Sequence, residues 1–101
     1  MDPDKPDIIN ISDVVVSTAG RDQGEWFYVI DEDPDYLMLA NGKDRTLDKP
    51  KRKKRKHVQK VLRSETRVAE KLIRGDKVLN GELRRDLAYL ASEMQANNLG
   101  G

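Results

Sequence analysis

Trp26-Phe27-Tyr28-Val29-Ile30 is a continuous run of aromatic and β-branched residues, and it decides the fold. A run of this length and composition is typical of a β-strand that is covered on both faces. We expect the strand to extend from Glu25 to Asp31. Side chains alternate along a strand, which places Trp26 and Tyr28 on one face and Phe27 on the other. We expect at least two of these three aromatic residues to be buried.

Further strands are predicted on both sides of this run. Three β-branched residues begin Val14-Val15-Val16-Ser17, and Tyr36-Leu37-Met38-Leu39-Ala40 follows a turn-forming stretch over residues 31–35. The dipeptide Asn41-Gly42 is a strong hairpin signal, so a short fourth strand is predicted over residues 43–47. The alternation over residues 57–62 predicts a fifth. Closing such short strands into a small antiparallel barrel would remove the exposed edges.

Two helices are predicted after the strands. Ser64 is a candidate cap for the first, and Gly75 stands where a left-handed residue would end it. Asn80 is a candidate cap for the second, which is expected to end before Asn97. The second helix has an apolar stripe at spacings of four, three and four residues, formed by Leu83, Leu87, Leu90 and Met94. The predicted fold class is therefore mainly β with C-terminal α, a small barrel followed by two short helices.

The two halves of the chain carry opposite charge. Residues 1–48 contain 12 acidic and 4 basic residues, a net charge of −8, whereas residues 49–101 contain 6 acidic and 15 basic residues, a net charge of +9. Such asymmetry suggests a basic surface directed at a polyanion.

The sequence predicts four segments. Residues 1–12 form a flexible acidic lead, and residues 13–62 form the barrel, including a basic arm over residues 49–60. Residues 63–96 form a helical extension, and residues 97–101 form a disordered tail.

Six consecutive cations occupy Lys51 to Lys56, flanked by Lys49 and Lys60. Like charges at this density repel one another and cannot form a core, so we expect a linker or an arm that a polyanion orders. Phosphate neutralisation by such cations releases counterions, the main source of non-specific affinity for nucleic acids. The alternative is a solvated linker without a ligand.

Several kinds of site are excluded by composition. The chain has no cysteine and a single histidine, His57, so neither a Cys/His metal set nor a nucleophile-His-acid triad can be assembled. No cofactor, no metal and no enzymatic activity are expected. His57 is either an RNA-facing donor or a residue that begins a strand. No signal peptide and no membrane-spanning run are recognisable, so we expect a cytoplasmic protein and no membrane partner.

The strand, glycine-containing loop and strand between Val14 and Ile30 resemble the KOW motif. The matching loop consists of Gly20, Arg21, Asp22, Gln23 and Gly24. Gly24 has a structural interpretation, a positive φ in a tight turn, and a functional one, close approach of backbone amides to phosphate. The resemblance continues through residues 37–42 and the basic run to His57, and it is to bacterial KOW-domain RNA-binding proteins related to a KOW-type large-subunit ribosomal protein of archaea and eukaryotes.

Membership in that family would imply an SH3-like barrel, RNA or ribosome binding, and no catalysis. The expected partner is ribosomal RNA of the large subunit, with ribosomal or translation-factor proteins beside it, and the free protein is expected to be a monomer. The candidate RNA-binding residues are Arg21, Lys43, Arg45, Lys49, Lys51, Arg52, Lys53, Lys54, Arg55, Lys56, His57, Lys60 and Arg63. A different hypothesis is a protein-interaction module, in which the barrel and the second helix dock on a transcription or translation factor.

Overall fold

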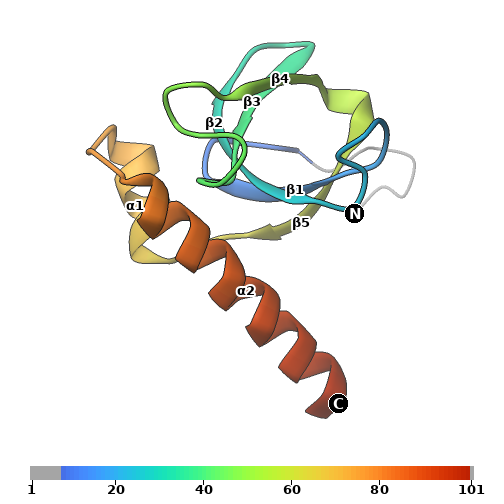
Figure 1. Cartoon of the computed structure of the whole chain (residues 1–101), viewed down its shortest axis with the longest axis vertical. Coiled ribbons are helices and arrows are strands. Elements are labelled where there is room, and N and C mark those ends of the chain that lie inside the picture. Colours follow the sequence, from blue (N-terminus) through green and yellow to red (C-terminus); the bar gives the residue numbers. More distant parts are fainter. Residues whose placement is uncertain (1–7, 101) are drawn as a thin grey trace.

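A computed structural model of the chain describes residues 8–100, and the side chains of residues 8–96. Five strands form one antiparallel sheet in the order β4-β3-β2-β1-β5, and two helices follow them (Figure 1). The elements are β1 (Asp13–Ser17), β2 (Trp26–Glu32), β3 (Tyr36–Ala40), β4 (Lys51–Lys54), the 3₁₀ turn η1 (Arg55–His57), β5 (Val58–Arg63), α1 (Arg67–Arg74) and α2 (Asn80–Gly100).

Four of the five strands occur where the sequence predicts them, namely β1, β2, β3 and β5, with ends that differ by one residue at most. The predicted strand over residues 43–47 is wrong. The backbone N–H groups of Asn41 and Gly42 both donate to the carbonyl oxygen of Arg45, at 2.9 and 3.0 Å. Residues 41–45 therefore form a closed turn, and no strand that pairs with β3 follows Gly42 directly. Residues 41–50 form a loop, and the fourth strand begins only at Lys51.

The basic run is therefore not the arm that the sequence predicts. Lys51 to Lys54 form β4, which pairs with β3 so that Lys54 lies opposite Tyr36 and Lys51 lies opposite Leu39. The next three residues form η1, which leads directly into β5.

The interior of the curved sheet is one apolar cluster. Its members come from β1, β2 and β3 and from the segment before β1, and the half-buried Val58 of β5 packs against them. The buried members are Ile9, Val15, Phe27, Val29, Leu37 and Leu39. Because one cluster receives side chains from four strands, the sheet has to curl around it, as Figure 1 shows.

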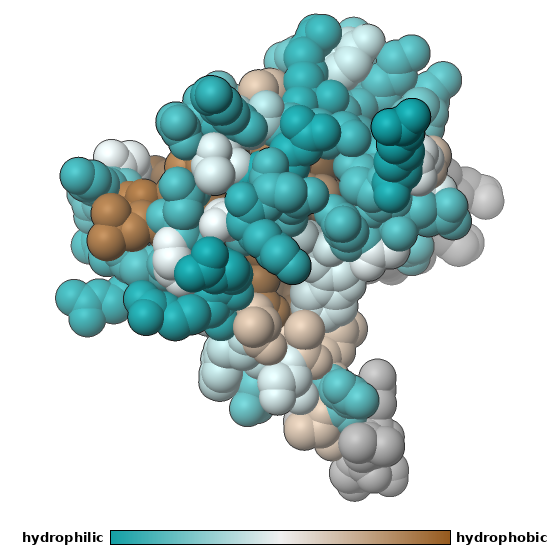
Figure 2. Space-filling model, viewed as in Figure 1, coloured by the Kyte–Doolittle hydropathy of each residue, from teal (hydrophilic) through white to brown (hydrophobic). Residues whose placement is uncertain are grey.

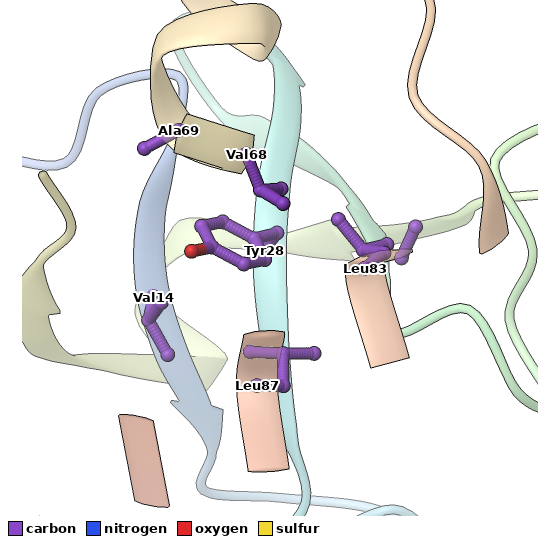
Figure 3. Packing of buried hydrophobic residues seen from close by; sticks show 7 residues of the cluster. Val14, Tyr28, Val68, Ala69, Leu83 and Leu87 are labelled. Atoms are coloured by element: carbon purple, nitrogen blue, oxygen red, sulfur yellow. The ribbon is translucent and has the colours of Figure 1, made fainter. Parts of the chain in front are cut away.

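A second cluster joins the outer face of the sheet to the helices. Tyr28 lies at its centre (Figure 3) and is fully buried together with Val14 of β1. Side chains of α1 and α2 cover these residues, namely Val68, Ala69, Leu83 and Leu87. Strand β2 is thus apolar on both faces because the sheet interior covers one face and the helices cover the other. Phe27 and Tyr28 are both buried and Trp26 is half-buried, which confirms the prediction for the aromatic residues.

A polar network at the contact between the helices and the outer face of the sheet holds the two together. The Tyr28 hydroxyl donates a hydrogen bond to the Asp86 carboxylate, and it lies 2.8 Å from the hydroxyl of Ser64. Thr66 Oγ1 donates to the same carboxylate at 2.8 Å. Burial, reinforced by the hydrogen bond to Asp86, raises the pKa of Tyr28 above its ordinary value. The phenol therefore stays protonated and remains a donor.

Both helices differ from the prediction at their ends. Thr66 rather than Ser64 caps α1, because its side chain accepts from the backbone N–H of Ala69 at 3.3 Å while Ser64 bonds Tyr28. Gly75 ends α1 in the left-handed conformation with φ 76°, as predicted. Asn80 begins α2, and its side-chain oxygen accepts from the backbone N–H of Leu47 at 2.8 Å.

Helix α2 is 21 residues long and is not short. It runs to Gly100, past the predicted end before Asn97 and into the segment predicted as a disordered tail. Figure 1 shows that its C-terminal part extends away from the sheet. Within the described residues, neither helix is both long and apolar enough to cross a membrane.

The segment just before β1 packs on the sheet, whereas the sequence predicts a flexible lead there. Ile9 is buried in the interior cluster, and the backbone N–H of Ser12 donates to the carbonyl oxygen of Val29 at 2.8 Å. The rest of the predicted lead, residues 1–7, and the last residue of the predicted tail lie outside the described residues.

Replacing Gly42 by Ala tests how α2 docks on the sheet. Gly42 has φ 77°, and a β-carbon on it would collide with the carbonyl oxygen of Asn80 at the start of α2. Gly24→Ala is the matched control, because Gly24 has φ 91° but nothing within 4 Å of an added β-carbon. Urea unfolding should show a loss of about 1–2 kcal/mol for the control, from backbone strain alone, and about 1–3 kcal/mol more for Gly42→Ala. Equal losses would mean that α2 does not approach Gly42 this closely.

Candidate nucleic-acid interface

Strand alternation divides the basic run into two sets. Lys53 lies opposite the buried Leu37, and Lys53 itself is only 7% exposed. Arg52 and Lys54, on either side of it in the chain, are exposed on the outer face of the sheet. Adjacent cations of one strand therefore have opposite environments.

The inward set is held by a single carboxylate from the loop between β1 and β2. Lys53 Nζ lies 2.6 Å from Asp22 Oδ1 and 2.7 Å from the carbonyl oxygen of Ala19. Lys51 Nζ lies 2.8 Å from the other carboxylate oxygen, and Ser17 Oγ donates to Asp22 Oδ1 at 2.7 Å. Asp22 thus pairs with two lysines, leaving one net positive charge in the group, and fastens the loop to β4.

The protonation state of Asp22 follows from these contacts. Burial alone would raise its pKa, but the ion pair with Lys51 and the hydrogen bonds from Lys53 and Ser17 outweigh burial and hold the pKa well below its ordinary value. The carboxylate therefore remains charged throughout the neutral range.

Two further cations of the predicted set are used within the fold. Arg55 pairs with Glu32 at 3.1 Å and donates to the carbonyl oxygen of Asp33 at 2.9 Å. Lys60 on β5 pairs with the buried Asp13 at 3.3 Å. These side chains hold η1 and β5 against the rest of the sheet.

The outward set consists of Arg52, Lys54 and Lys56, and all three side chains are exposed. Of the ion pairs within 4.0 Å that occur among residues 8–96, none includes these three. The guanidinium of Arg52 instead lies over the ring of Tyr36, 3.6 Å from its centroid. The charge of this set is therefore directed at solvent.

A pocket of about 420 Å³ adjoins the outward set, between the β2–β3 turn and η1. It is lined by Pro34, Asp35, Tyr36, Lys54, Arg55 and Lys56. The backbone N–H of Arg55 donates to the carbonyl oxygen of Asp35 at 3.0 Å, which ties the two walls together.

The other predicted RNA-binding residues are spread over separate elements. Five of them are exposed, namely Arg21 in the β1–β2 loop, Lys43, Arg45 and Lys49 in the 41–50 loop, and Arg63 at the end of β5. His57 is half-buried at the end of η1, directly before β5, and its carbonyl oxygen accepts from the backbone N–H of Thr18 at 2.9 Å. His57 therefore ends η1, and β5 begins one residue later, at Val58.

The KOW-like loop has the conformation that its glycines suggest. Gly20 and Gly24 have φ 88° and 91°, values that favour glycine. The carboxylate of Asp22, between them, accepts a hydrogen bond from Lys53 of β4, while Arg21 and Gln23 are exposed. The loop therefore presents one cation and binds the inward lysines.

Sequence reasoning missed two features of the site. The sequence predicts Asp22 only as a loop residue, although it is the counter-ion of the inward lysines, and it predicts Tyr36 only as the start of a strand, although the residue contacts Arg52. The local sequence gives no signal for the first, because residues 51–56 are all cations and nothing distinguishes the inward lysines from their neighbours. Nothing in the local sequence links Tyr36 to Arg52, since the two meet only through strand pairing.

No group of three or more His, Cys, Asp or Glu side chains in the described part of the chain is arranged to hold a metal ion. Neither a known family model nor a curated protein matches the chain.

Asp22→Asn tests the inward ion pair. At neutral pH it should lower the free energy of unfolding by about 3 kcal/mol, because it leaves Lys53 buried without a counter-ion. The folded-state pKa of Asp22 is depressed, so its stabilising effect is complete above its pKa in the unfolded chain and is lost as the pH falls. The difference between wild type and variant should therefore shrink below about pH 4. Urea unfolding from pH 2.5 to 7 measures it.

The double variant Asp22→Asn, Lys53→Met is the control. Removing both charges should recover part of the lost stability, since a well-packed apolar pair often replaces a buried ion pair without loss. Additive losses from the two single changes would show that the side chains do not interact.

Proposed function

We propose that this protein is a non-enzymatic RNA-binding protein of the translation apparatus. Arg52, Lys54 and Lys56 contact RNA phosphates, and the expected RNA is that of the large ribosomal subunit. The other exposed cations extend the contact at its margins. The proposal includes no cofactor and a monomeric free protein.

The observation that carries the proposal is the outward set of cations on β4 and η1. A rigid strand holds Arg52 and Lys54 about 6.6 Å apart along one face. Neither cation lies within 4.0 Å of a carboxylate oxygen among the described side chains. Cations held in place lose little freedom when a phosphate binds, and the counterions that the phosphate releases favour the complex.

The inward set contributes to the same function by positioning. Lys53 and Asp22 hold β4 in the register that turns Arg52 and Lys54 toward solvent. Arg55 pairs with Glu32 and keeps η1 in place, so that Lys56 follows the strand closely. Specificity would come from the shape of the RNA more than from its bases, because contacts to phosphates carry no sequence information.

Assignment to a KOW-type, SH3-like barrel forms part of the proposal. The curved five-stranded antiparallel sheet supports it, and so do the two left-handed glycines, Gly20 and Gly24, in the loop that resembles the motif. The resemblance in sequence is the basis for naming the ribosome as the expected location.

The triple variant Arg52→Ser, Lys54→Ser, Lys56→Ser tests the interface. Affinity for a fluorescently labelled fragment of large-subunit ribosomal RNA is measured at several salt concentrations. Log affinity of the wild type should fall steeply with log salt, and the variant should reduce the magnitude of that slope by about 2 to 3, from three lost phosphate contacts.

The matched control removes three exposed cations from the helices and the loop between them, Arg67→Ser, Lys77→Ser and Arg85→Ser, with the same change in net charge. It should leave the slope nearly unchanged. If the control reduces the slope as much as the triple variant does, net charge rather than the outward set causes binding. A wild type that shows no salt-dependent binding at all contradicts the proposed function.

A second candidate function is docking on a protein, and the exposed part of α2 favours it. Tyr89 and Met94 on this helix are 55% and 36% exposed. Figure 2 shows pale residues among hydrophilic ones on the helix that extends from the body, and brown, hydrophobic residues on the body near α1. An apolar side chain directed at solvent costs free energy that a protein partner of the translation apparatus would recover.

Tyr89→Ser combined with Met94→Ser distinguishes the two functions. If α2 docks on a ribosomal protein, co-sedimentation with purified large subunits should weaken by about 5-fold or more, while affinity for free RNA stays unchanged. Ser92→Ala with Gln95→Ala, on the same part of the helix, is the control. Unchanged co-sedimentation of both variants would exclude α2 as a docking element on that particle.

A further inference from the structure

The pocket beside the outward set combines an aromatic ring with charges of both signs. Tyr36 lies opposite Lys54 in the β3–β4 ladder, and both residues line the pocket together with Lys56. Asp35, an acidic residue, lines it as well. An aromatic surface next to cations can hold a base and its phosphates together.

Tyr36 is held in a defined orientation before any ligand binds. Arg52 covers one face of the ring, with the guanidinium carbon 3.6 Å from the centroid. Tyr36 lines the pocket, whereas Arg52 does not, so the contact between the two lies outside the pocket. The adjoining turn is rigid, since Asp33 Oδ1 accepts from the backbone N–H groups of Asp35 and Tyr36 at 2.9 and 2.7 Å.

The distribution of charge around the ring determines how a nucleotide can enter. Lys54 and Lys56 attract phosphate, while Asp35 repels it, so the phosphates must lie on the lysine side of the pocket. Hydrogen bonds from the backbone N–H groups of Tyr36 and Asp35 lower the pKa of Asp33, which therefore adds a second negative charge at the turn. A neutral base is the part of a nucleotide that tolerates the acidic side.

We infer that this pocket binds an unpaired nucleotide of the RNA, with its base stacked on Tyr36 and its phosphates on Lys54 and Lys56. The inference rests on the proposed RNA binding and specifies its ligand, a single-stranded or looped segment. A base within a duplex is already stacked on its neighbours and cannot reach the ring. The outward cations can still contact the phosphates of a duplex, which makes the two kinds of RNA separable.

Tyr36→Leu and Tyr36→Phe test the inference. The probes are a 12-nucleotide single-stranded RNA that carries one 2-aminopurine, a fluorescent base quenched by stacking, and a duplex of the same length. Phe keeps the aromatic face and should bind both probes within about 2-fold of the wild type. Leu keeps apolar bulk without the ring and should bind the single strand about 10-fold more weakly, since a base stacked on an aromatic side chain contributes roughly this factor or more.

The duplex separates the outcomes. Tyr36→Leu should leave duplex affinity unchanged and should abolish quenching in the single strand, and urea unfolding confirms that the variant is folded. If Leu binds the single strand as the wild type does, or loses affinity for both probes equally, the stacking site is wrong while RNA binding stands. If the wild type binds neither probe in a salt-dependent manner, the proposed function fails and the stacking site fails with it.

Discussion

The ion pair between Lys53 and Asp22 is the constraint on which the charged surface depends. A lysine that is 7% exposed inside a small sheet is unfavourable unless a carboxylate neutralises it, and Asp22 lies 2.6 Å away. Side chains alternate along a strand, so a shift of β4 by one residue would bring Arg52 or Lys54 inward and expose Lys53. The ion pair therefore selects one register, and that register determines which cations solvent can reach.

Most of the sheet could be predicted because β1, β2 and β3 consist mainly of apolar residues. Most side chains of residues 14–16, 26–30 and 36–40 pack in the two apolar clusters, and burial is what hydrophobic patterning reports. β4 has no such pattern, since all four of its residues are cations. Its inner and outer positions differ only in their access to Asp22, which lies 31 residues away from Lys53 in the chain. The local sequence therefore does not indicate which positions of β4 face Asp22.

The same limit applies to the candidate site and to the helices. A basic surface was predictable from charge, but the division into neutralised and exposed cations depends on tertiary contacts with Asp22, Glu32 and Asp13. Ser64 looks like a helix cap in the sequence, yet its hydroxyl lies in hydrogen-bonding contact with Tyr28, and the cap passes to Thr66 two residues later. A cation can pair with a carboxylate or face solvent, and Ser64 can cap a helix or bond Tyr28. Tertiary contacts, which the local sequence does not contain, decide between these alternatives.

Strand β4 forms one edge of the sheet, and an open edge can pair with a strand of another molecule. Two such edges brought together would place Arg52 and Lys54 of one copy against the same cations of the next, and the repulsion opposes aggregation. The cations that the proposed function assigns to RNA would therefore also oppose self-association of the free protein through this edge. A bound polyanion would remove this repulsion, but it would also cover β4, so that a strand of another molecule could not pair with the edge.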